Sequence, residues 1–273
     1  MSYSLTSARP STHRAALSAY LFATPMLFGG LSTAAMAADL PTKAPQPQPP
    51  AYSWSGCYVG INGGAGGSAS NFNTNVGAGG YLTGTDPGTV DGDGGGSANK
   101  TIGTGGGQAG CNWQMNTAVV GLEGDFDYFR SNANFSNNTG TLAAGTPFTI
   151  GQSVATNYLA TVRPRLGIAA DRSLAYITGG AAFTDATYTE SYVDAAGGIG
   201  SASASKSLVG WTAGAGWEYA WADHWTFKVE YLYASFATTN AVGVIAGPGG
   251  TNPLSGSGDL VIQTLRGGVN LKF

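Results

Sequence analysis

The chain has 273 residues, of which 10% are charged, 11% are aromatic and 44 are glycine, and its formal net charge is -3. A soluble globular domain usually carries about 25% charged residues and about 7% glycine. This composition excludes an ordinary water-facing surface, and the absence of a polybasic patch excludes a nucleic-acid-binding protein. It favours strands, turns and an apolar exterior.

The N-terminal segment has the pattern of a secretory signal. Arg9 and Arg14 precede an apolar run over residues 15–31. Small residues typical of a cleavage site follow at Ala35-Met36-Ala37. The alternative is a membrane-spanning helix, but the run contains Pro25 and falls short of the about 20 residues that such a helix needs. We expect cleavage after Ala37.

Three regions of different composition follow one another along the chain. After the signal peptide (1–37), residues 38–51 include a proline-rich run that favours an extended polyproline conformation, as in a periplasmic linker. From residue 52 to 273 the pattern has a period of two, which is typical of strands. Because no later apolar stretch reaches spanning-helix length, any membrane spanning requires strands closed into a barrel.

Eight segments alternate apolar and polar residues. They cover residues 56–62, 106–115, 119–129, 157–169, 174–183, 209–221, 225–233 and 260–273. Short turns connect them at 116–117, 171–173 and 222–224, and long links connect them at 67–104, 131–153, 190–206 and 236–258. Short periplasmic turns and long external loops are typical of outer-membrane barrels. The pattern predicts an all-β fold, an eight-stranded antiparallel up-and-down transmembrane β-barrel located in the outer membrane.

Large aromatic residues on the apolar face gather at two heights. The set next to the short turns or the C-terminus is Trp113, Trp217, Trp221, Trp225 and Phe273, and the set next to the long links is Phe126, Tyr128, Tyr158, Trp211, Tyr231 and Tyr233. Eight residues of strand tilted by about 40° separate the sets by about 20 Å, close to the apolar band of such barrels. We expect two aromatic girdles in contact with outer-membrane lipid. A soluble β-sandwich, which is the alternative, has no reason to sort aromatics in this way.

The polar face carries five acidic and five basic residues: Glu123, Asp125, Asp127, Glu218, Glu230, Arg163, Arg165, Lys228, Arg266 and Lys272. Side chains fill the interior of an eight-stranded barrel. We therefore predict a charge-balanced luminal network, in which the acidic residues of 123–127 pair with Arg163 and Arg165, and Glu218 pairs with Lys228. A narrow diffusion pore is the alternative, because inward glycines such as Gly60 leave space.

Two local features modify the wall. Cys57 and Cys111 share the apolar face of adjacent segments, and an oxidising periplasm predicts a disulfide across the first hairpin, with two free thiols as the alternative. Pro164 removes a backbone donor from a strand and predicts a local bulge.

Other motifs are not expected to carry chemistry. Gly105-x-Gly107-x-x-Gly110 matches a dinucleotide fingerprint but leads into a strand, where a helix is required. Asp91-Gly-Asp93 lacks the remaining ligands of a calcium loop. His224, the single histidine after the signal, lies in a predicted turn. We expect no enzymatic activity, no metal and no cofactor.

Five motifs together carry a family resemblance: Trp54-Ser-Gly-Cys-Tyr-Val-Gly60, Gly105-Gly-Gly-Gln-Ala-Gly-Cys-Asn-Trp-Gln114, Thr161-Val-Arg-Pro-Arg-Leu-Gly167, Gly210-Trp-Thr-Ala-Gly-Ala-Gly-Trp-Glu-Tyr219 and Lys228-Val-Glu-Tyr-Leu-Tyr233. From Trp54 to Phe273 the chain resembles the small outer-membrane porin-like proteins of Gram-negative bacteria, relatives of the outer-membrane protein A barrel and the opacity proteins. Pro164 departs from the usual pattern of that family.

The resemblance implies insertion by the outer-membrane assembly machinery, whose recognition signal is similar to Val269-x-Leu271-x-Phe273. It also implies a role in envelope integrity or as a surface antigen, and in some members ligand or haem binding. We expect a structural, surface-exposed barrel that is a monomer, with an oligomer as the alternative state. A narrow diffusion porin and a surface ligand-binding protein are the alternative functions.

Overall fold

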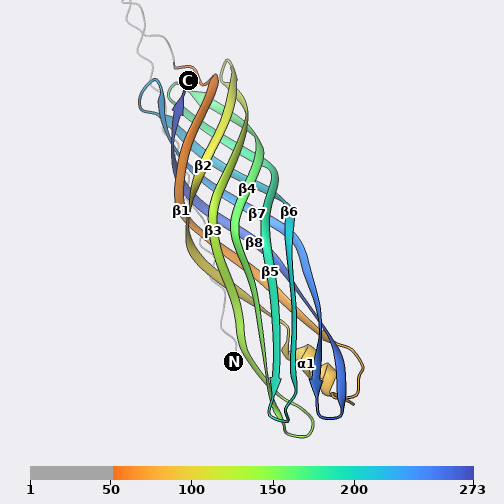
Figure 1. Cartoon of the computed structure of the whole chain (residues 1–273). Helices are drawn as coiled ribbons and strands as arrows, with labels where there is room; N and C mark the ends of the chain where they lie inside the picture. The colour runs from red at the N-terminus through yellow and green to blue at the C-terminus, as the bar shows by residue number, and fades with distance from the viewer. Residues whose placement is uncertain (1–51) are drawn as a thin grey trace, which may run out of the picture. The chain divides into compact units, whose positions relative to one another are not determined.

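The computed structural model describes residues 52–273, so the predicted signal peptide (1–37) and the predicted linker (38–51) lie outside the described residues. No helix within 52–273 is long and apolar enough to cross a membrane. Eight antiparallel strands close into a barrel, in which each strand pairs with its sequence neighbours and the first pairs with the last (Figure 1). The predicted fold class is confirmed.

The strands are β1 (Gly56–Val76), β2 (Gly96–Met115), β3 (Ala118–Thr141), β4 (Pro147–Ala170), β5 (Ser173–Asp194), β6 (Ile199–Ala220), β7 (Trp225–Gly247) and β8 (Gly250–Lys272). A short helix, α1 (Asp86–Asp93), lies between β1 and β2. The strands range from 20 residues in β2 to 24 residues in β3 and β4, whereas about 9–11 residues suffice to cross a membrane. Much of the barrel must therefore extend beyond the bilayer.

The prediction of long external loops is wrong, because most of the residues assigned to these loops continue the strands. The four connections at this end shrink to residues 77–95, 142–146, 195–198 and 248–249. Short polar alternations extend the strands here, as in Ser201-Ala-Ser-Ala-Ser205. The predicted short turns are present at the other end, where Asn116 and Asp171 adopt positive φ of 56° and 51°. Asn and Asp tolerate this left-handed conformation better than most residues.

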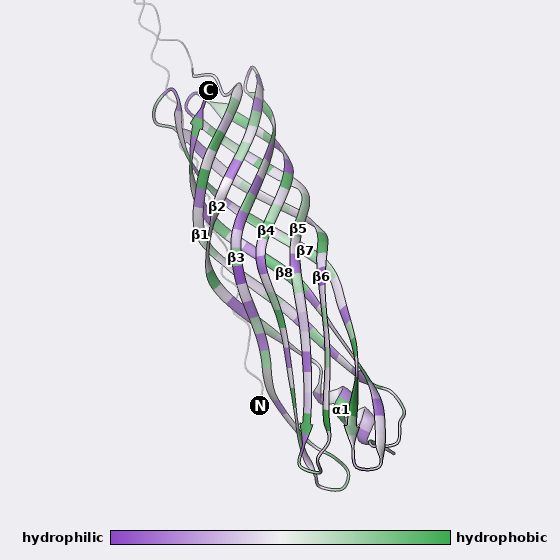
Figure 2. Ribbon diagram, in the orientation of Figure 1, coloured by the Kyte–Doolittle hydropathy of each residue, from purple (hydrophilic) through white to green (hydrophobic). Residues whose placement is uncertain are grey.

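Hydrophobic and hydrophilic residues are interspersed along the strands over the whole barrel (Figure 2), but the face that the apolar residues occupy changes along the barrel axis. In the half next to the short turns, which we call the membrane half, apolar side chains such as Ile61 and Leu122 point outward, and charged side chains point inward. We call the aromatic set next to the long links the upper set, the set next to the short turns the lower set, and the part of the barrel beyond the upper set the outer half. The exposed residues of the outer half include Asn71, Asn73, Asn75, Ser201, Ser203, Ser205 and Ser207. Its interior is apolar and includes Phe72, Phe129, Phe148, Val154, Tyr188, Tyr192, Phe236, Ile245, Leu254 and Leu260.

Aromatic residues of both predicted sets lie on the outer face of the membrane half. In the upper set, Phe126 stacks on Tyr158 at 5.5 Å, and Trp211 contacts Tyr233 at 5.3 Å between ring centroids. In the lower set, Trp221 and Trp225 stack across the β6–β7 turn. The exposed members are Trp113, Phe126, Tyr128, Trp211, Trp217, Trp221, Trp225, Tyr231 and Phe273.

Pro164 causes no bulge, so that prediction is wrong. The β3–β4 register runs through the Leu122↔Pro164 pair without a shift. On the β5 side, the ladder omits Arg163 and Pro164 and resumes in the same register at Arg165↔Thr178. The hydroxyl of Thr178 donates to the Pro164 carbonyl oxygen at 2.9 Å. The missing donor therefore interrupts pairing locally but does not displace the strand.

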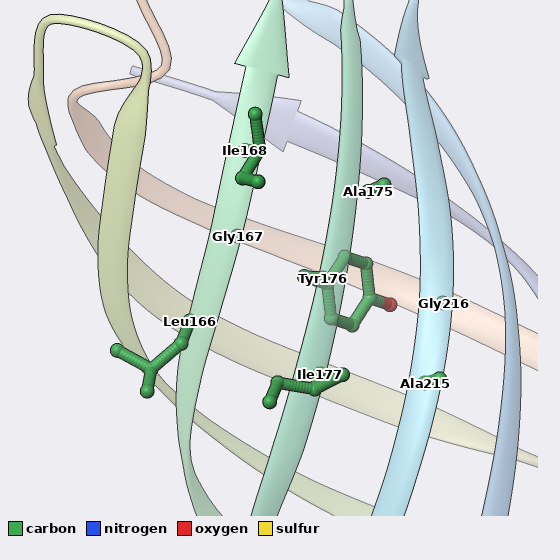
Figure 3. Close-up of a pocket in the computed structure, with 8 residues that line it drawn as sticks. All are labelled: Leu166, Gly167, Ile168, Ala175, Tyr176, Ile177, Ala215 and Gly216. Carbon is green, nitrogen blue, oxygen red and sulfur yellow. The ribbon is translucent and has the colours of Figure 1, made fainter.

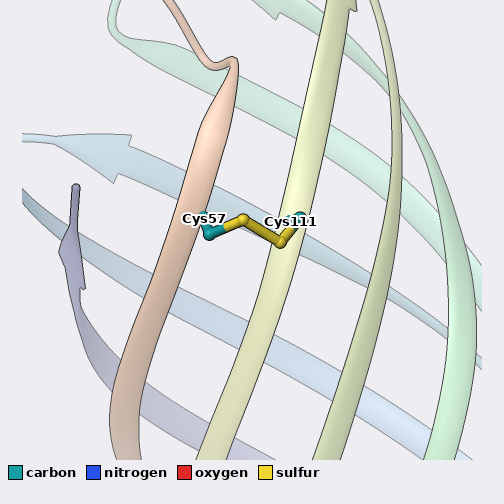
Figure 4. The surroundings of a disulfide bond; sticks show 2 residues. All are labelled: Cys57 and Cys111. Atoms are coloured by element: carbon teal, nitrogen blue, oxygen red, sulfur yellow. A yellow bond between two sulfur atoms is a disulfide. The ribbon is translucent and has the colours of Figure 1, made fainter.

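Cys57 and Cys111 lie directly opposite each other in the β1–β2 ladder and form a disulfide (Figure 4). The bond joins residues 54 positions apart and spans the connection that carries α1. Cross-linking a loop of this length reduces the conformational entropy of the unfolded chain. We therefore expect the bond to stabilise the first hairpin.

Replacing both cysteines (Cys57→Ser with Cys111→Ser) should lower the free energy of unfolding by about 2–4 kcal/mol. The measurement is urea-induced unfolding of the protein folded in detergent. A thiol reductant should shift the wild-type midpoint toward that of the double variant and leave the double variant unchanged. Equal midpoints for oxidised wild type and double variant would contradict a stabilising role.

Candidate functional site: the interior of the barrel

A buried charged cluster fills the membrane half. Its members are Glu123, Asp125, Asp127, Arg163, Arg165, Glu218, Lys228, Glu230 and Arg266, each with at most 7% of its surface exposed. Five strands supply these side chains, at positions that alternate with the outward apolar residues. Because the ladder is closed, the charged side chains on the inner faces of β3, β4 and β7 all point into the same part of the lumen.

Two arginines connect the carboxylates. Arg163 lies 2.7 Å from Glu123, 2.8 Å from Asp125 and 3.2 Å from Glu230. Arg266 lies 3.0 Å from Asp125 and 2.7 Å from Glu230, and it also pairs with Asp127. Because one guanidinium presents five donors in a fixed plane, each arginine bridges carboxylates from different strands. The pairs therefore tie opposite walls of the barrel together.

Arg165 and Lys228 complete the cluster next to Glu123. Arg165 pairs with Glu218 at 2.7 Å and with Glu123 at 3.3 Å. Its guanidinium carbon lies 3.9 Å from the centre of the Tyr176 ring, a cation–π contact. The Nζ of Lys228 lies 2.9 Å from Glu123.

Two details of the predicted network differ from the structure. Glu218 and Lys228 are opposite in the β6–β7 register, but Lys228 reaches inward to Glu123 and Glu230 instead. Lys272 is half-buried at the periplasmic end, where its Nζ lies 4.7 Å from the Tyr52 ring centre and donates to the Ser53 carbonyl. The cluster thus contains five acidic and four basic residues and is not formally balanced.

Trp54 closes the periplasmic end, a role that sequence analysis did not identify. Its side chain is 1% exposed and packs with Val119, Leu174 and Tyr176. The indole Nε1 donates to the carbonyl oxygen of Asp171 at 3.1 Å, and its backbone amide donates to Gln114 Oε1 at 2.7 Å. A tryptophan just before a strand, between a linker and a barrel, was the available signal.

A cap made by residues 77–95 closes the opposite end. Leu82 and Val90 are buried against the apolar core of the outer half. The side chain of Asn252, which is fully buried, fastens the cap with four hydrogen bonds. Its Nδ2 donates to the carbonyl oxygens of Gly77 and Leu82, and its Oδ1 accepts from the amides of Tyr81 and Leu82, at 2.8–3.1 Å.

Below the cap lies a buried carboxyl group that forms no ion pair with a basic residue of the described range 52–273. Glu190 is 1% exposed and lies in the outer half, beyond the upper aromatic set. It accepts hydrogen bonds from Thr74, from Gln152 at 3.2 Å and from Tyr188 at 3.1 Å. Burial raises the pKa of Glu190 above its ordinary value of 4.5, although these hydrogen bonds oppose the shift. The site therefore favours the neutral form of Glu190 more than water does.

Asp194, at the rim, behaves in the opposite way. It accepts hydrogen bonds from Tyr81 and Tyr192 and from the amides of Ala196 and Gly198, at 2.7–2.9 Å. Burial disfavours its charge, but these donors outweigh it and lower its pKa. Burial and the bond to Asp194 raise the pKa of Tyr81 to about 12. The rim thus holds an ionised carboxylate that fastens the cap to β5.

The outer face of the membrane half contains a shallow apolar hollow (Figure 3). It forms where the small outward side chains of Ala175 and Ala215 lower the surface beside the exposed side chains of Leu166 and Ile177. The predicted assembly signal lies on the same outer face: Phe273 and Leu271 are exposed, and Val269 is half-buried. These features belong to the apolar exterior and not to the interior.

The remaining motifs lie apart from these sites. Residues 105–110 are part of β2. The Asp91 carboxylate accepts a hydrogen bond from the Val76 amide at 2.6 Å within the cap. His224 lies in the β6–β7 turn, with its Nδ1 3.0 Å from the Lys272 carbonyl oxygen.

Replacing Arg266 with methionine should lower the free energy of unfolding by about 3–5 kcal/mol, because it leaves buried carboxylates without their cation. Arg172→Met is the matched control, since its exposed pair with Asp223 should contribute at most about 1 kcal/mol. Urea unfolding in lipid vesicles measures both variants. A loss for Arg266→Met no larger than that of the control would contradict a stabilising cluster.

The raised pKa of Glu190 predicts a pH dependence with a definite sign. The folded form binds the proton more tightly, so the contribution of Glu190 to stability is present below pH 4.5 and is lost as the pH rises through its folded-state pKa. The urea midpoint of wild type should therefore fall as the pH is raised above 4.5, relative to that of Glu190→Gln, which stays neutral. Parallel pH profiles would show that Glu190 does not titrate in this way.

A model of the outer membrane protein beta-barrel domain family matches residues 26–273. The 31 kDa outer-membrane immunogenic protein of Brucella melitensis biotype 1 is 36% identical over 259 residues, covering 89% of this chain and 95% of that protein. The 25 kDa outer-membrane immunogenic protein of Brucella abortus biovar 1 is 28% identical, covering 89% and 92%. Among solved structures, the outer membrane protein OprG from Pseudomonas aeruginosa is 11% identical, with a TM-score of 0.39, covering 81% of this chain and 99% of that one. The chain belongs to the outer membrane protein beta-barrel family, and its location is the outer membrane.

Proposed function

We propose that this protein is a closed structural pillar of the outer membrane, which stabilises the envelope and displays its outer half at the cell surface. The observation that carries the proposal is the filling of the interior from end to end. Trp54, the charged cluster, the aromatic core and the cap around Leu82 and Val90 occupy it in succession. These four layers argue against a continuous water-filled path through the described residues.

The charged cluster supports a structural role over a conducting one. Its side chains are buried, and each cation contacts two or more carboxylates. Moving a solute past them requires breaking several buried ion pairs at once, which leaves charges without partners in a dry interior. We infer that the cluster cross-links the strands and helps to specify their register.

The outer half supports the display role. Its serine- and asparagine-rich exterior is suited to water, and its own apolar core holds it rigid beyond the bilayer. Related Brucella proteins are named outer-membrane immunogenic proteins, which is consistent with exposure at the surface. We also infer a non-enzymatic role, because His224 lies in a turn at the end opposite the cap, away from the displayed surface.

The folded protein should produce no steady stepwise conductance in planar lipid bilayers, because its interior is filled. Different gel mobility before and after boiling confirms that the sample used is a folded barrel. The relevant comparison is Trp54→Ala, which removes only the side chain that closes the periplasmic end. This variant should also show no conductance steps. Regular conductance steps from folded wild type would overturn the closed-pillar proposal and favour a narrow diffusion porin.

A further inference from the structure

The barrel wall is open along one side of the outer half. The β2–β3 ladder stops at the Gly105↔Tyr128 pair, although β2 continues to Gly96 and β3 runs on to its own end. Beyond this point β2 pairs with β1 alone, and β3 pairs with β4 alone. Each strand therefore presents an edge of unpaired backbone donors and acceptors. We call residues 97–104 of β2 and 129–134 of β3 the seam; it lies between the strands labelled β2 and β3 in Figure 1.

The exposure of β2 shows that the seam is open to solvent. Asn99, Lys100 and Thr101 are exposed in succession, whereas alternate residues are buried where the wall is closed. Lys100 lies opposite Ser68, whose hydroxyl is buried and contacts that of Ser131 at 2.5 Å. Opposite residues point to the same side of a sheet. Lys100 is therefore on the inner side by register but reaches solvent.

The seam is bounded at both ends. At the membrane end, the hydroxyl of Thr104 donates to the carbonyl oxygen of Tyr128 at 3.0 Å, where the ladder closes. At the far end, the side-chain amide of Asn138 donates to the carbonyl oxygen of Asp93 in the cap. Because Tyr128 belongs to the upper aromatic set, the opening starts at the outer membrane surface. Its length suits an extended segment of about six residues.

The side chains beside the seam are cationic. Arg130 is exposed on β3, and Lys100 is exposed on β2. Neither forms an ion pair with a carboxylate in the chain from residue 52 onward. The outward carboxylates of Asp185 and Asp259 accept hydrogen bonds from asparagines instead. Two positive charges thus flank a free strand edge without a counterion from this chain.

We propose that the seam binds a short, extended, acidic segment of a partner polypeptide, which adds a strand to the free edge of β3. Main-chain hydrogen bonds supply the affinity, and Lys100 and Arg130 select for negative charge. The β6–β7 ladder is also interrupted, but it resumes at Ala202↔Gly243 and so leaves no comparable slot. The inference goes beyond the structural role proposed above and stands whether or not the barrel conducts.

The first test is amide hydrogen exchange of the protein in phosphatidylcholine nanodiscs. Amides of residues 129–134 that face the seam should exchange much faster than those of the β7–β8 ladder, since they lack partners. Exchange as slow as that of the β7–β8 ladder would overturn the proposal, because the edge would then be closed.

The second test uses a labelled, end-blocked hexapeptide of alternating glutamate and valine. It should bind and slow the exchange of the seam amides, and Lys100→Glu with Arg130→Glu should weaken binding at least tenfold. Lys206→Glu is the matched control, since Lys206 is an exposed lysine on β6, and binding should be unchanged. Gel mobility before and after boiling confirms that each variant is folded.

A peptide with the same charges, in which proline replaces valine, separates strand addition from simple charge attraction. It should not bind, because proline at alternate positions removes half of the backbone donors and fixes φ near about −65°, which favours a polyproline conformation over a strand in a ladder. Equal binding of both peptides would overturn the proposal. Two further results would overturn the proposal. One is that an added phosphorylated lipid, but not the peptide, slows hydrogen exchange of the seam amides. The other is that the protein dimerises through this edge in the absence of peptide.

Discussion

Closure of the hydrogen-bonded ladder is the constraint on which the rest of this structure depends. In hydrocarbon a backbone amide finds no water, so every strand in the membrane half must be paired on both sides. Eight strands satisfy this requirement with a narrow interior. The closed wall then forces each strand to direct alternate side chains inward, and residues far apart in the chain, such as Glu123 and Lys228, meet at 2.9 Å.

The medium outside the wall changes along the barrel, and the interior changes with it. Where lipid surrounds the strands, apolar residues face outward and ions must pair inside. Where water surrounds the strands, serine and asparagine face outward and aromatic residues pack inside. Phe72 and Tyr188 are an example, with 6.2 Å between their ring centroids. Both halves have the same alternation with a period of two. They differ only in which face of the strands, inner or outer, carries the apolar residues. The wall is strictly closed only where lipid demands it, and the β2–β3 ladder ends at Tyr128.

The membrane half could be predicted from sequence because its two faces differ strongly. Large aromatics outward and charges inward defined the strands, the turn at Asn116 and the pairing of Cys57 with Cys111. The outer half was mistaken for loops, because its polar face consists of small residues that also occur in loops. The alternation Asn71-Phe-Asn-Thr-Asn-Val76 was visible, but its apolar face points inward, opposite to that of the membrane segments.

The ion pairs in the interior depend on how far each side chain extends, and the strand register alone does not specify this. Glu218 and Lys228 are cross-strand neighbours, yet the long lysine side chain extends across the lumen to Glu123. Lys272 shares the inward parity of the cluster but lies too near the strand end, where Tyr52 and Ser53 receive it. Alternation predicts the face of each residue, whereas the packing of opposite walls decides its partner.

The contacts of Trp54 affect how the barrel responds to a pulling force. The segment that precedes β1 enters through this residue, whose indole is buried and bonded to the β4–β5 turn at Asp171. A force applied to the chain upstream is therefore shared with the far side of the barrel before it reaches the first strand. With Trp54 as an anchor, part of the load passes to β2 through Gln114 and to the β4–β5 turn through Asp171.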